Sequence, residues 1–324
     1  MHDSGITEPT AETAVIFDHA RRLEANIADV VLGRPHTIRL TLVALLAGEH
    51  ILLEDVPGVG KTLIGKALAQ SVSGKFCRIQ FTPDLLPGDI TGISMYRQAD
   101  SEFEFLPGPV FANIVLADEI NRTTPRTQSA LLEAMSDCQV SVDTETHRLP
   151  EPFMVIATQN PFEFEGTYPL PESQLDRFLL RISVGYPGRE QELQVIEDHR
   201  KSNPLDRVQP VIECDQLLTM QQMVREVQVS SVIRHYLLDL VEATRKSEEL
   251  HVGASTRGTL CLYRAAQAFA VLDGRTYVVP DDVQQLAVPV LAHRVITKGY
   301  MHGGHRQATE AVLTEIVKHV PVPE

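Results

Sequence analysis

The chain has 324 residues, about twice the ~150 residues of a common domain, so two domains are expected. Hydrophobic residues make up 43% and charged residues 22%, which are values of an ordinary globular protein and exclude a disordered or collagen-like chain. The 43 acidic side chains outnumber the 29 basic ones, for a net charge of -14, and no run of Lys or Arg occurs. This balance argues against a nucleic-acid partner.

The cysteines and the first residues indicate where such a chain resides. Cys77, Cys138, Cys214 and Cys261 are scattered without metal-ligand spacing, so we expect free buried thiols in a reducing compartment. The first residues lack the basic and apolar regions of a signal peptide, and no apolar run approaches the ~18 residues of a membrane span. We therefore expect a cytoplasmic protein without membrane insertion.

The first two thirds of the chain alternate between helical and strand patterns. Ile38, Leu42 and Leu45 have helical spacing and Gly48 is placed to end their helix. Apolar strands are expected at 51–53, 76–81, 114–117, 153–157 and 178–184. Strands that alternate with helices predict a mostly parallel sheet covered on both faces.

Two segments interrupt this alternation, and the last third changes character. A period of two over 93–105 and over 139–149 predicts β-hairpin inserts, with irregular surface loops as the alternative. From about Gly188 the strands are expected to stop. Helices are predicted at 190–199, 214–227, 232–246, 255–272 and 281–293. The Pro/Gly turn at 186–188 fits a hinge between an α/β core at 1–187 and an all-helical domain at 188–324.

A glycine-rich loop joins the first strand to the following helix. Its glycines let backbone N–H groups face an anion, its lysine suits the β- and γ-phosphates, and its hydroxyl suits Mg²⁺. The expected nucleotide-binding residues are Val56, Pro57, Gly58, Val59, Gly60, Lys61, Thr62 and Leu63. Asp55 occupies the place where the usual phosphate-loop pattern has its first glycine. An ordinary turn with an exposed lysine is the alternative.

Two adjacent carboxylates follow the apolar strand 114–117. The carboxyl ends of parallel strands form the edge where ligands bind in open α/β sheets. Asp118 is expected to orient Mg²⁺ together with Thr62, while Glu119 is expected to position or deprotonate the attacking water. The alternative is a solvated acidic turn, which is disfavoured because a phosphate loop is expected beside it.

The strand 153–157 ends in a second polar tip that includes Asn160. An amide offers both donors and an acceptor, so Asn160 can hydrogen-bond a γ-phosphate and the lytic water at once. The order of phosphate loop, acid pair and polar strand tip favours this role over a plain turn before Pro161.

Several long motifs make the chain resemble a MoxR-family AAA+ ATPase. They are the stretches 53–62, 81–87, 108–113, 119–122, 166–172, 174–178 and 253–257. The resemblance runs from about residue 31 to residue 293. It implies a P-loop NTPase core of the AAA+ type with β-hairpin inserts, followed by an all-α lid, and it implies ATP and Mg²⁺ as ligands.

The resemblance also implies roles that spacing alone does not provide. AAA+ proteins form homo-oligomeric rings, usually hexamers, with ATP at the subunit interfaces. Arg177 would then be the arginine finger that reaches a neighbour's γ-phosphate, with Arg122 or Arg126 as competing candidates, and Arg257 would be the sensor arginine of the lid. A guanidinium suits this task because it stabilises charge on the transferring phosphoryl group.

The adenine end of the site is expected in front of the first core strand. There, Val31, Leu32 and Gly33 match the place where AAA+ backbone contacts the base. The alternative is the apolar start of a helix.

The family resemblance suggests chaperone-like remodelling, maturation or activation of a protein client, including metal or cofactor insertion, with a von Willebrand factor A domain protein as a partner. The hairpin side chains Met95, Tyr96, Phe103 and Phe105 are candidate client contacts, against the alternative that some form the hairpin's core. A chelatase motor subunit, a nucleic-acid-remodelling AAA+ protein and an ATP-gated scaffold stay open as rivals. The pair His302 and His305 offers too few ligands for a metal site.

Overall fold

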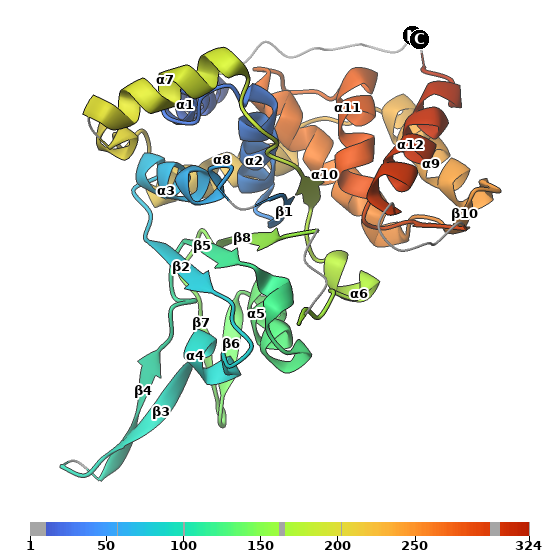
Figure 1. Cartoon of the computed structure of the whole chain (residues 1–324). Helices are drawn as coiled ribbons and strands as arrows, with labels where there is room; N and C mark the ends of the chain where they lie inside the picture. Colours follow the sequence, from blue (N-terminus) through green and yellow to red (C-terminus); the bar gives the residue numbers. More distant parts are fainter. Residues whose placement is uncertain are drawn as a thin grey trace.

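The computed structural model describes residues 11–56, 58–99, 101–161, 166–201, 203–298 and 305–323 (Figure 1). The helices are α1 (Ala11–Ala28), α2 (Pro35–Ala47), α3 (Lys61–Ser71), α4 (Pro87–Thr91), α5 (Pro125–Asp137), α6 (Glu172–Leu175), α7 (Arg189–Lys201), α8 (Cys214–Glu226), α9 (Ser231–Lys246), α10 (Thr256–Leu272), α11 (Pro280–Leu291) and α12 (His305–His319), with the short 3-10 helices η1 (Ile120–Arg122) and η2 (Pro204–Arg207). The strands are β1 (Ile51–Glu54), β2 (Phe76–Gln80), β3 (Gly92–Arg97), β4 (Glu102–Pro107), β5 (Ile114–Asp118), β6 (Gln139–Val142), β7 (Glu145–Arg148), β8 (Met154–Gln159), β9 (Leu180–Ile182), β10 (Leu250–Val252) and β11 (Ile296–Thr297).

Five strands form the central sheet in the order β2, β5, β8, β1, β9, and every neighbouring pair is parallel. The strands β1 and β5 are buried along their whole length, because side chains on both faces of the sheet meet other elements. Leu53, Leu116 and Ile156 point into one buried cluster, whereas Leu52 and Val115 point into another on the opposite face. The predicted parallel sheet covered on both faces is confirmed.

The larger of the two clusters continues from the sheet into the helices of the last third. It contains residues of α2, α8, α9, α10 and α11, and α10 packs directly on α2. Figure 1 shows these later helices (orange and red) beside the early helices of the chain. The expected lid is therefore packed against the core, and the boundary between residues 187 and 188 stays a prediction.

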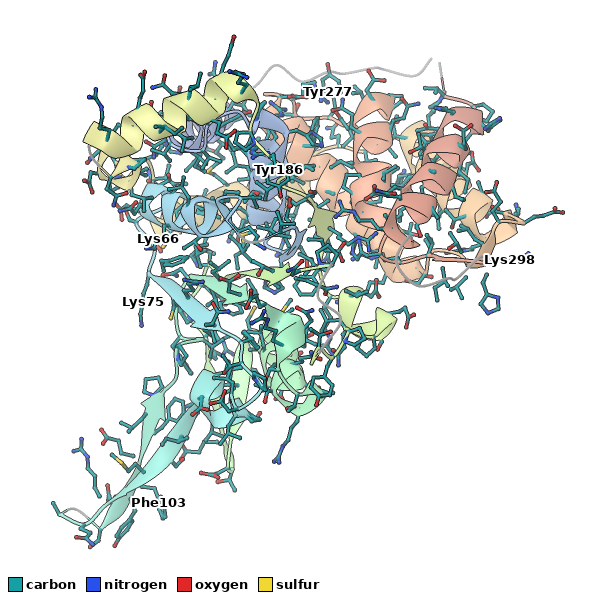
Figure 2. The ribbon with its side chains drawn as sticks, viewed as in Figure 1. Lys66, Lys75, Phe103, Tyr186, Tyr277 and Lys298 are labelled. Atoms are coloured by element: carbon teal, nitrogen blue, oxygen red, sulfur yellow. The ribbon has the colours of Figure 1, made fainter. Side chains whose placement is uncertain are left out.

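Two β-hairpins leave the sheet, as the period-two pattern predicted. The strands β3 and β4 pair antiparallel from Gly92 and Pro107 to Arg97 and Glu102, and β6 pairs with β7 in the same way. Figure 1 shows the β3–β4 hairpin projecting far from the body, and Figure 2 places Phe103 on this projection. The hairpins stand on the same side of the molecule as α4 and α5.

The last third differs from the sequence-based expectation in two ways. Strands do not stop at Gly188, because β10 and β11 pair antiparallel beside α9 and α12. These strands have three and two residues, which is too short for a period-two pattern to show in the sequence. The helix α12 was also not predicted, although it packs against α9 and α11.

The cysteines are free, as expected, but they are not uniformly buried. Cys261 is buried and Cys77 and Cys214 are half-buried, whereas Cys138 is exposed. Cys138 ends α5 in the left-handed conformation, with φ of 49°, so it sits at a turn into β6 and not in a core. Within the described part of the chain, no helix is long and apolar enough to cross a membrane.

Candidate nucleotide site

A cleft of about 500 Å³ opens where the carboxyl ends of β1 and β5 meet the first turn of α3. Its lining residues come from five separate segments of the chain: Val30, Val31, Leu32, Arg34, Gly58, Val59, Gly60, Lys61, Thr62, Leu63, Arg78, Asp118, Glu119, Pro187 and Val195. The phosphate loop, the acid pair and the expected adenine contact therefore share one cavity, as the sequence pattern predicted for an α/β sheet.

The phosphate loop has the backbone that glycine permits. Gly58 and Gly60 have φ of 86° and 95°, and a Cβ at either would meet nothing within 4 Å. Conformation and not space therefore requires glycine at both positions. Lys61 is the first residue of α3, is buried, and donates from Nζ to the Asp55 carbonyl at 2.9 Å. Pro57 lies outside the described residues.

Asp55 fastens the start of the phosphate loop to the segment that follows β9. Its Oδ2 accepts from Ser183 Oγ at 2.8 Å and from the Gly185 N–H at 2.5 Å, while Oδ1 accepts from its neighbour Val56 N–H at 2.9 Å. Burial by itself raises the pKa of the Asp55 carboxyl, but the hydrogen bonds to Gly185, Ser183 and Val56 outweigh it and lower the pKa. Asp55, which replaces the usual glycine, thus links the phosphate loop to the β9–α7 connection through a charged side chain.

Asp118 ends β5 with both of its carboxylate oxygens hydrogen-bonded. Thr158 Oγ1 donates to Oδ1 at 2.5 Å. Arg78, on the neighbouring strand β2, donates to Oδ2 from Nη2 at 2.5 Å and from Nε at 3.1 Å. Asp118 is 8% exposed, and its charge is balanced by the half-exposed Arg78.

Glu119 has an unusual backbone for a residue with a side chain. Its φ of 59° and ψ of 48° lie in the left-handed region, which costs energy for a non-glycine residue. The Glu119 N–H donates to Thr158 Oγ1 at 2.9 Å. Its Oε2 accepts from Gln80 Nε2 at 2.7 Å and lies 3.4 Å from Arg122 Nε. Thr158 therefore fixes both members of the acid pair.

The expected adenine contact lies at the other end of the cleft. Val31 and Leu32 line it, and Gly33 has φ of 70°. A Cβ at Gly33 would come within 2.7 Å of the Gln191 side chain of α7, so glycine is required there by both conformation and space. The next residue, Arg34, is buried and donates to the Val184 carbonyl, on the same connection that Asp55 holds.

Asn160 follows β8 directly and is buried. The strand β8 lies between β1 and β5, and the Asp55 N–H donates to the Gln159 carbonyl at 3.1 Å. Asn160 therefore lies at the same sheet edge as the phosphate loop and the acid pair, although it is not among the residues that line the cleft, and its expected role stays a prediction.

Arg177 and Arg257 lie away from this cleft. Together they line a second cavity of about 260 Å³ beside α5, with Ser129, Leu132, Glu133, Ser136, Asp137 and Gln174. Arg177 donates to the Leu132 carbonyl at 2.7 Å and to Ser136 Oγ, and Arg257 Nε is 3.7 Å from Asp176 Oδ2. Neither arginine lines the subunit's own phosphate cleft.

The competing arginines are placed differently. Arg122 faces the subunit's own Glu119, and Arg126 is exposed in the first turn of α5. The choice among the three as the trans-acting finger stays a prediction.

The donor set of the cleft suits Mg²⁺. Thr62 and Asp118 offer a hydroxyl and a carboxylate, and Mg²⁺ is commonly held by one or two protein oxygens together with substrate phosphates and waters. Among the described residues, no group of three or more His, Cys, Asp or Glu side chains forms a separate metal site. His302 lies outside the described residues, as does the side chain of His305.

Sequence reasoning missed three residues that hold the acid pair, namely Arg78, Gln80 and Thr158. Arg78 and Gln80 alternate on β2, so they share one face of that strand, and a pair of polar residues at this spacing was the available signal. Thr158 lies in the polar tip before Asn160, where the sequence gives no local sign of its contacts with the acid pair. Its role depends on the register that places β8 beside β5.

Comparison with known proteins adds an independent line of information. Residues 50–180 match the ATPase family associated with various cellular activities (AAA), and residues 242–316 match an AAA lid domain. The chain is 50% identical to an uncharacterized protein, YeaC, of Bacillus subtilis, over 92% of this chain and 93% of that protein. It is 41% identical to chaperone MoxR1 of Mycobacterium tuberculosis, over 92% of this chain and 81% of that protein. A solved structure of a candidate ATPase from Cytophaga hutchinsonii matches with a TM-score of 0.88 and 37% identity, over 97% of both chains.

Proposed function

The chain belongs to the MoxR family of AAA+ ATPases, and from this premise we propose that it hydrolyses ATP with Mg²⁺ to drive remodelling of a protein client. One observation carries the proposal: Lys61 and Thr62 of the phosphate loop line the same cleft as Asp118 and Glu119. A cation, a hydroxyl and two carboxylates around one cavity are the groups that phosphoryl transfer from ATP requires. A cytoplasmic location is part of this proposal.

Each group of residues in the cleft has its own role in the proposed reaction. The glycine-rich backbone and Lys61 bind the β- and γ-phosphates, and Val31, Leu32 and Gly33 receive the adenine. Thr62 and Asp118 would hold Mg²⁺, which supplies charge compensation on the phosphate oxygens when bound. Glu119 accepts a proton from the attacking water as the water oxygen bonds to the γ-phosphorus and the bond to ADP breaks. Asn160 orients that water and the γ-phosphate.

We further propose that the enzyme works as a ring, with a hexamer as the expected form. The placement of Arg177 and Arg257 supports this, since both line a cavity apart from the subunit's own cleft. In the proposed ring, Arg177 would serve the nucleotide of a neighbouring subunit, and Arg257 would be the sensor arginine of the lid. A guanidinium supplied by the neighbour would make hydrolysis depend on assembly.

The projecting β3–β4 hairpin is the proposed client contact. Phe103 is 74% exposed and Met95 is 48% exposed. The ring centroids of Phe103 and Tyr96 are 5.3 Å apart. Exposed apolar side chains gathered on one projection mark a surface that binds another protein. Phe105 is excluded from this surface because it is half-buried and stacks on His147 of the second hairpin, with 3.7 Å between the ring centroids. Maturation or metal insertion as the outcome, and a von Willebrand factor A domain partner, are part of the same proposal.

The substitution Glu119→Gln tests the proposed chemistry. The amide keeps the size of the side chain and its contact with Gln80 but cannot accept a proton, so ATP binding should persist while phosphate release falls by about 10²–10⁴-fold. Binding is measured by calorimetry with Mg·ATP and turnover by phosphate release. Retained wild-type hydrolysis would remove Glu119 from its role, and a wild-type protein that neither binds nor hydrolyses ATP would contradict the proposal as a whole.

A further inference from the structure

Arg78 lines the nucleotide cleft, although no phosphate-loop or acid-pair motif contains it. It lies on β2, which is an edge strand of the central sheet, and its side chain is 48% exposed. Two of its nitrogens donate to a single oxygen, Oδ2 of Asp118, and Nη2 also donates to Gln80 Oε1 at 2.9 Å. Arg78 is thus a cation held against the carboxylate that has to serve Mg²⁺.

A divalent ion that binds Asp118 would compete with Arg78 for the carboxylate. Thr158 donates to Oδ1 and Arg78 donates to Oδ2, so a divalent ion at Oδ2 would meet the guanidinium there. A second cation at Oδ2 would stand within a few ångströms of the guanidinium, and like charges at that separation repel each other. Asp118 cannot keep both contacts at full strength.

We propose that Arg78 is a resident counter-cation at Asp118 that leaves this carboxylate when Mg²⁺ and nucleotide bind. In the absence of ligand, its charge stabilises a nearly buried acid that would otherwise be uncompensated. Its half-exposed side chain has solvent on one side into which it can move. The inference rests on the proposed function and assigns to Arg78 a positioning role: it raises the Mg²⁺ concentration that nucleotide loading requires.

The test measures the binding of a fluorescent, non-hydrolysable ATP analogue, methylanthraniloyl-AMPPNP, at a series of free Mg²⁺ concentrations. Wild type is compared with Arg78→Gln, which removes the charge, and with Arg78→Lys, which keeps the charge but offers a single ammonium group. Arg264→Gln is the matched control, because Arg264 is also half-exposed and pairs at 2.6 Å with the mostly buried Glu49, away from the cleft lining.

The half-saturating Mg²⁺ concentration should fall about two- to fivefold in Arg78→Gln, a size set by the strength of a half-exposed ion pair. It should lie between wild type and Arg78→Gln in Arg78→Lys, and it should not move in Arg264→Gln. Because the readout is binding, it does not depend on turnover.

Two results would overturn the inference alone. One is an unchanged half-saturating Mg²⁺ concentration in both Arg78 variants. The other is a half-saturating Mg²⁺ concentration equal to that of wild type, together with weaker nucleotide affinity at saturating Mg²⁺. That result would show that Arg78 is a phosphate ligand. If Arg78→Gln does not fold, the half-saturating Mg²⁺ concentration is compared between wild type and Arg78→Lys instead. Absence of nucleotide binding by wild type at any Mg²⁺ concentration would instead refute the proposed function, and the inference with it.

Discussion

Thr158 joins Asp118 and Glu119, the two carboxylates proposed to act in the reaction, and its replacement by valine is the sharpest test of how this acid pair is held. Thr158 is fully buried, and its hydroxyl donates to Asp118 and accepts from the Glu119 N–H. Valine keeps the shape and removes both bonds. One buried carboxylate oxygen and one backbone N–H then lose their partners, which should lower the free energy of unfolding by about 2–4 kcal/mol.

Turnover should fall further than stability alone explains. Glu119 keeps its left-handed backbone with the help of the bond to Thr158, and without it the carboxylate moves from its working position. A displacement of this kind costs on the order of 10–100-fold in rate, while the phosphate loop is untouched, so nucleotide affinity should persist. Urea unfolding, nucleotide binding and phosphate release measure the three effects separately.

Thr41→Val is the matched control for this experiment. Thr41 is also buried, but its hydroxyl donates only to the Thr37 carbonyl at 2.8 Å, one turn earlier in α2. That carbonyl keeps its helical N–H partner, so the expected loss of unfolding free energy is about 1 kcal/mol or less, with unchanged turnover. If Thr158→Val behaved like Thr41→Val in both stability and turnover, the assigned role of the Thr158 hydroxyl would be wrong.

Two further predictions concern the groups that hold the cleft. Gln80→Ala should raise basal ATP turnover several-fold, because the Gln80 amide holds Oε2 of Glu119 beside β2 and its loss frees the carboxylate to turn toward the attacking water; unchanged or lower phosphate release would show that Gln80 instead helps to position Glu119. Asp55→Asn should destabilise the protein at neutral pH, because an amide cannot accept from Ser183, Gly185 and Val56 as the carboxylate does. The folded-state pKa of Asp55 is lowered, so the stability that its carboxylate adds is lost on acidification. In urea unfolding, the difference in stability between wild type and Asp55→Asn should therefore be constant above about pH 5 and shrink below about pH 4. A difference that grew on acidification would contradict this.

The parts of the site that the sequence could predict are those in which adjacent residues carry the chemistry. The phosphate loop needs glycines, a lysine and a hydroxyl in one short run, and the acid pair follows its strand directly, so local spacing was sufficient for both. The alternation of strands and helices then placed these segments at one sheet edge. The strands β1 and β5 are buried on both faces, which is why they read as continuous apolar runs.

The remaining parts depend on contacts between distant segments. Arg78 meets Asp118 across 40 positions, and Asp55 meets Gly185 across 130, so neither pairing leaves a local pattern. The same holds for Arg257, whose motif marks it as a lid arginine but does not indicate which cavity it lines. Its place beside Arg177, in the cavity next to α5, is visible only in the folded structure.

The central claim is that a neighbouring subunit completes the catalytic site. The most direct measurement is the ATPase rate per subunit against protein concentration, with Mg²⁺ and saturating ATP, for wild type and for Arg177→Ala. The account predicts a specific activity that rises with concentration to a plateau and a near-basal rate for Arg177→Ala at every concentration, although both proteins bind nucleotide. A wild-type rate that is independent of concentration, or an Arg177→Ala enzyme as active as wild type, would contradict it.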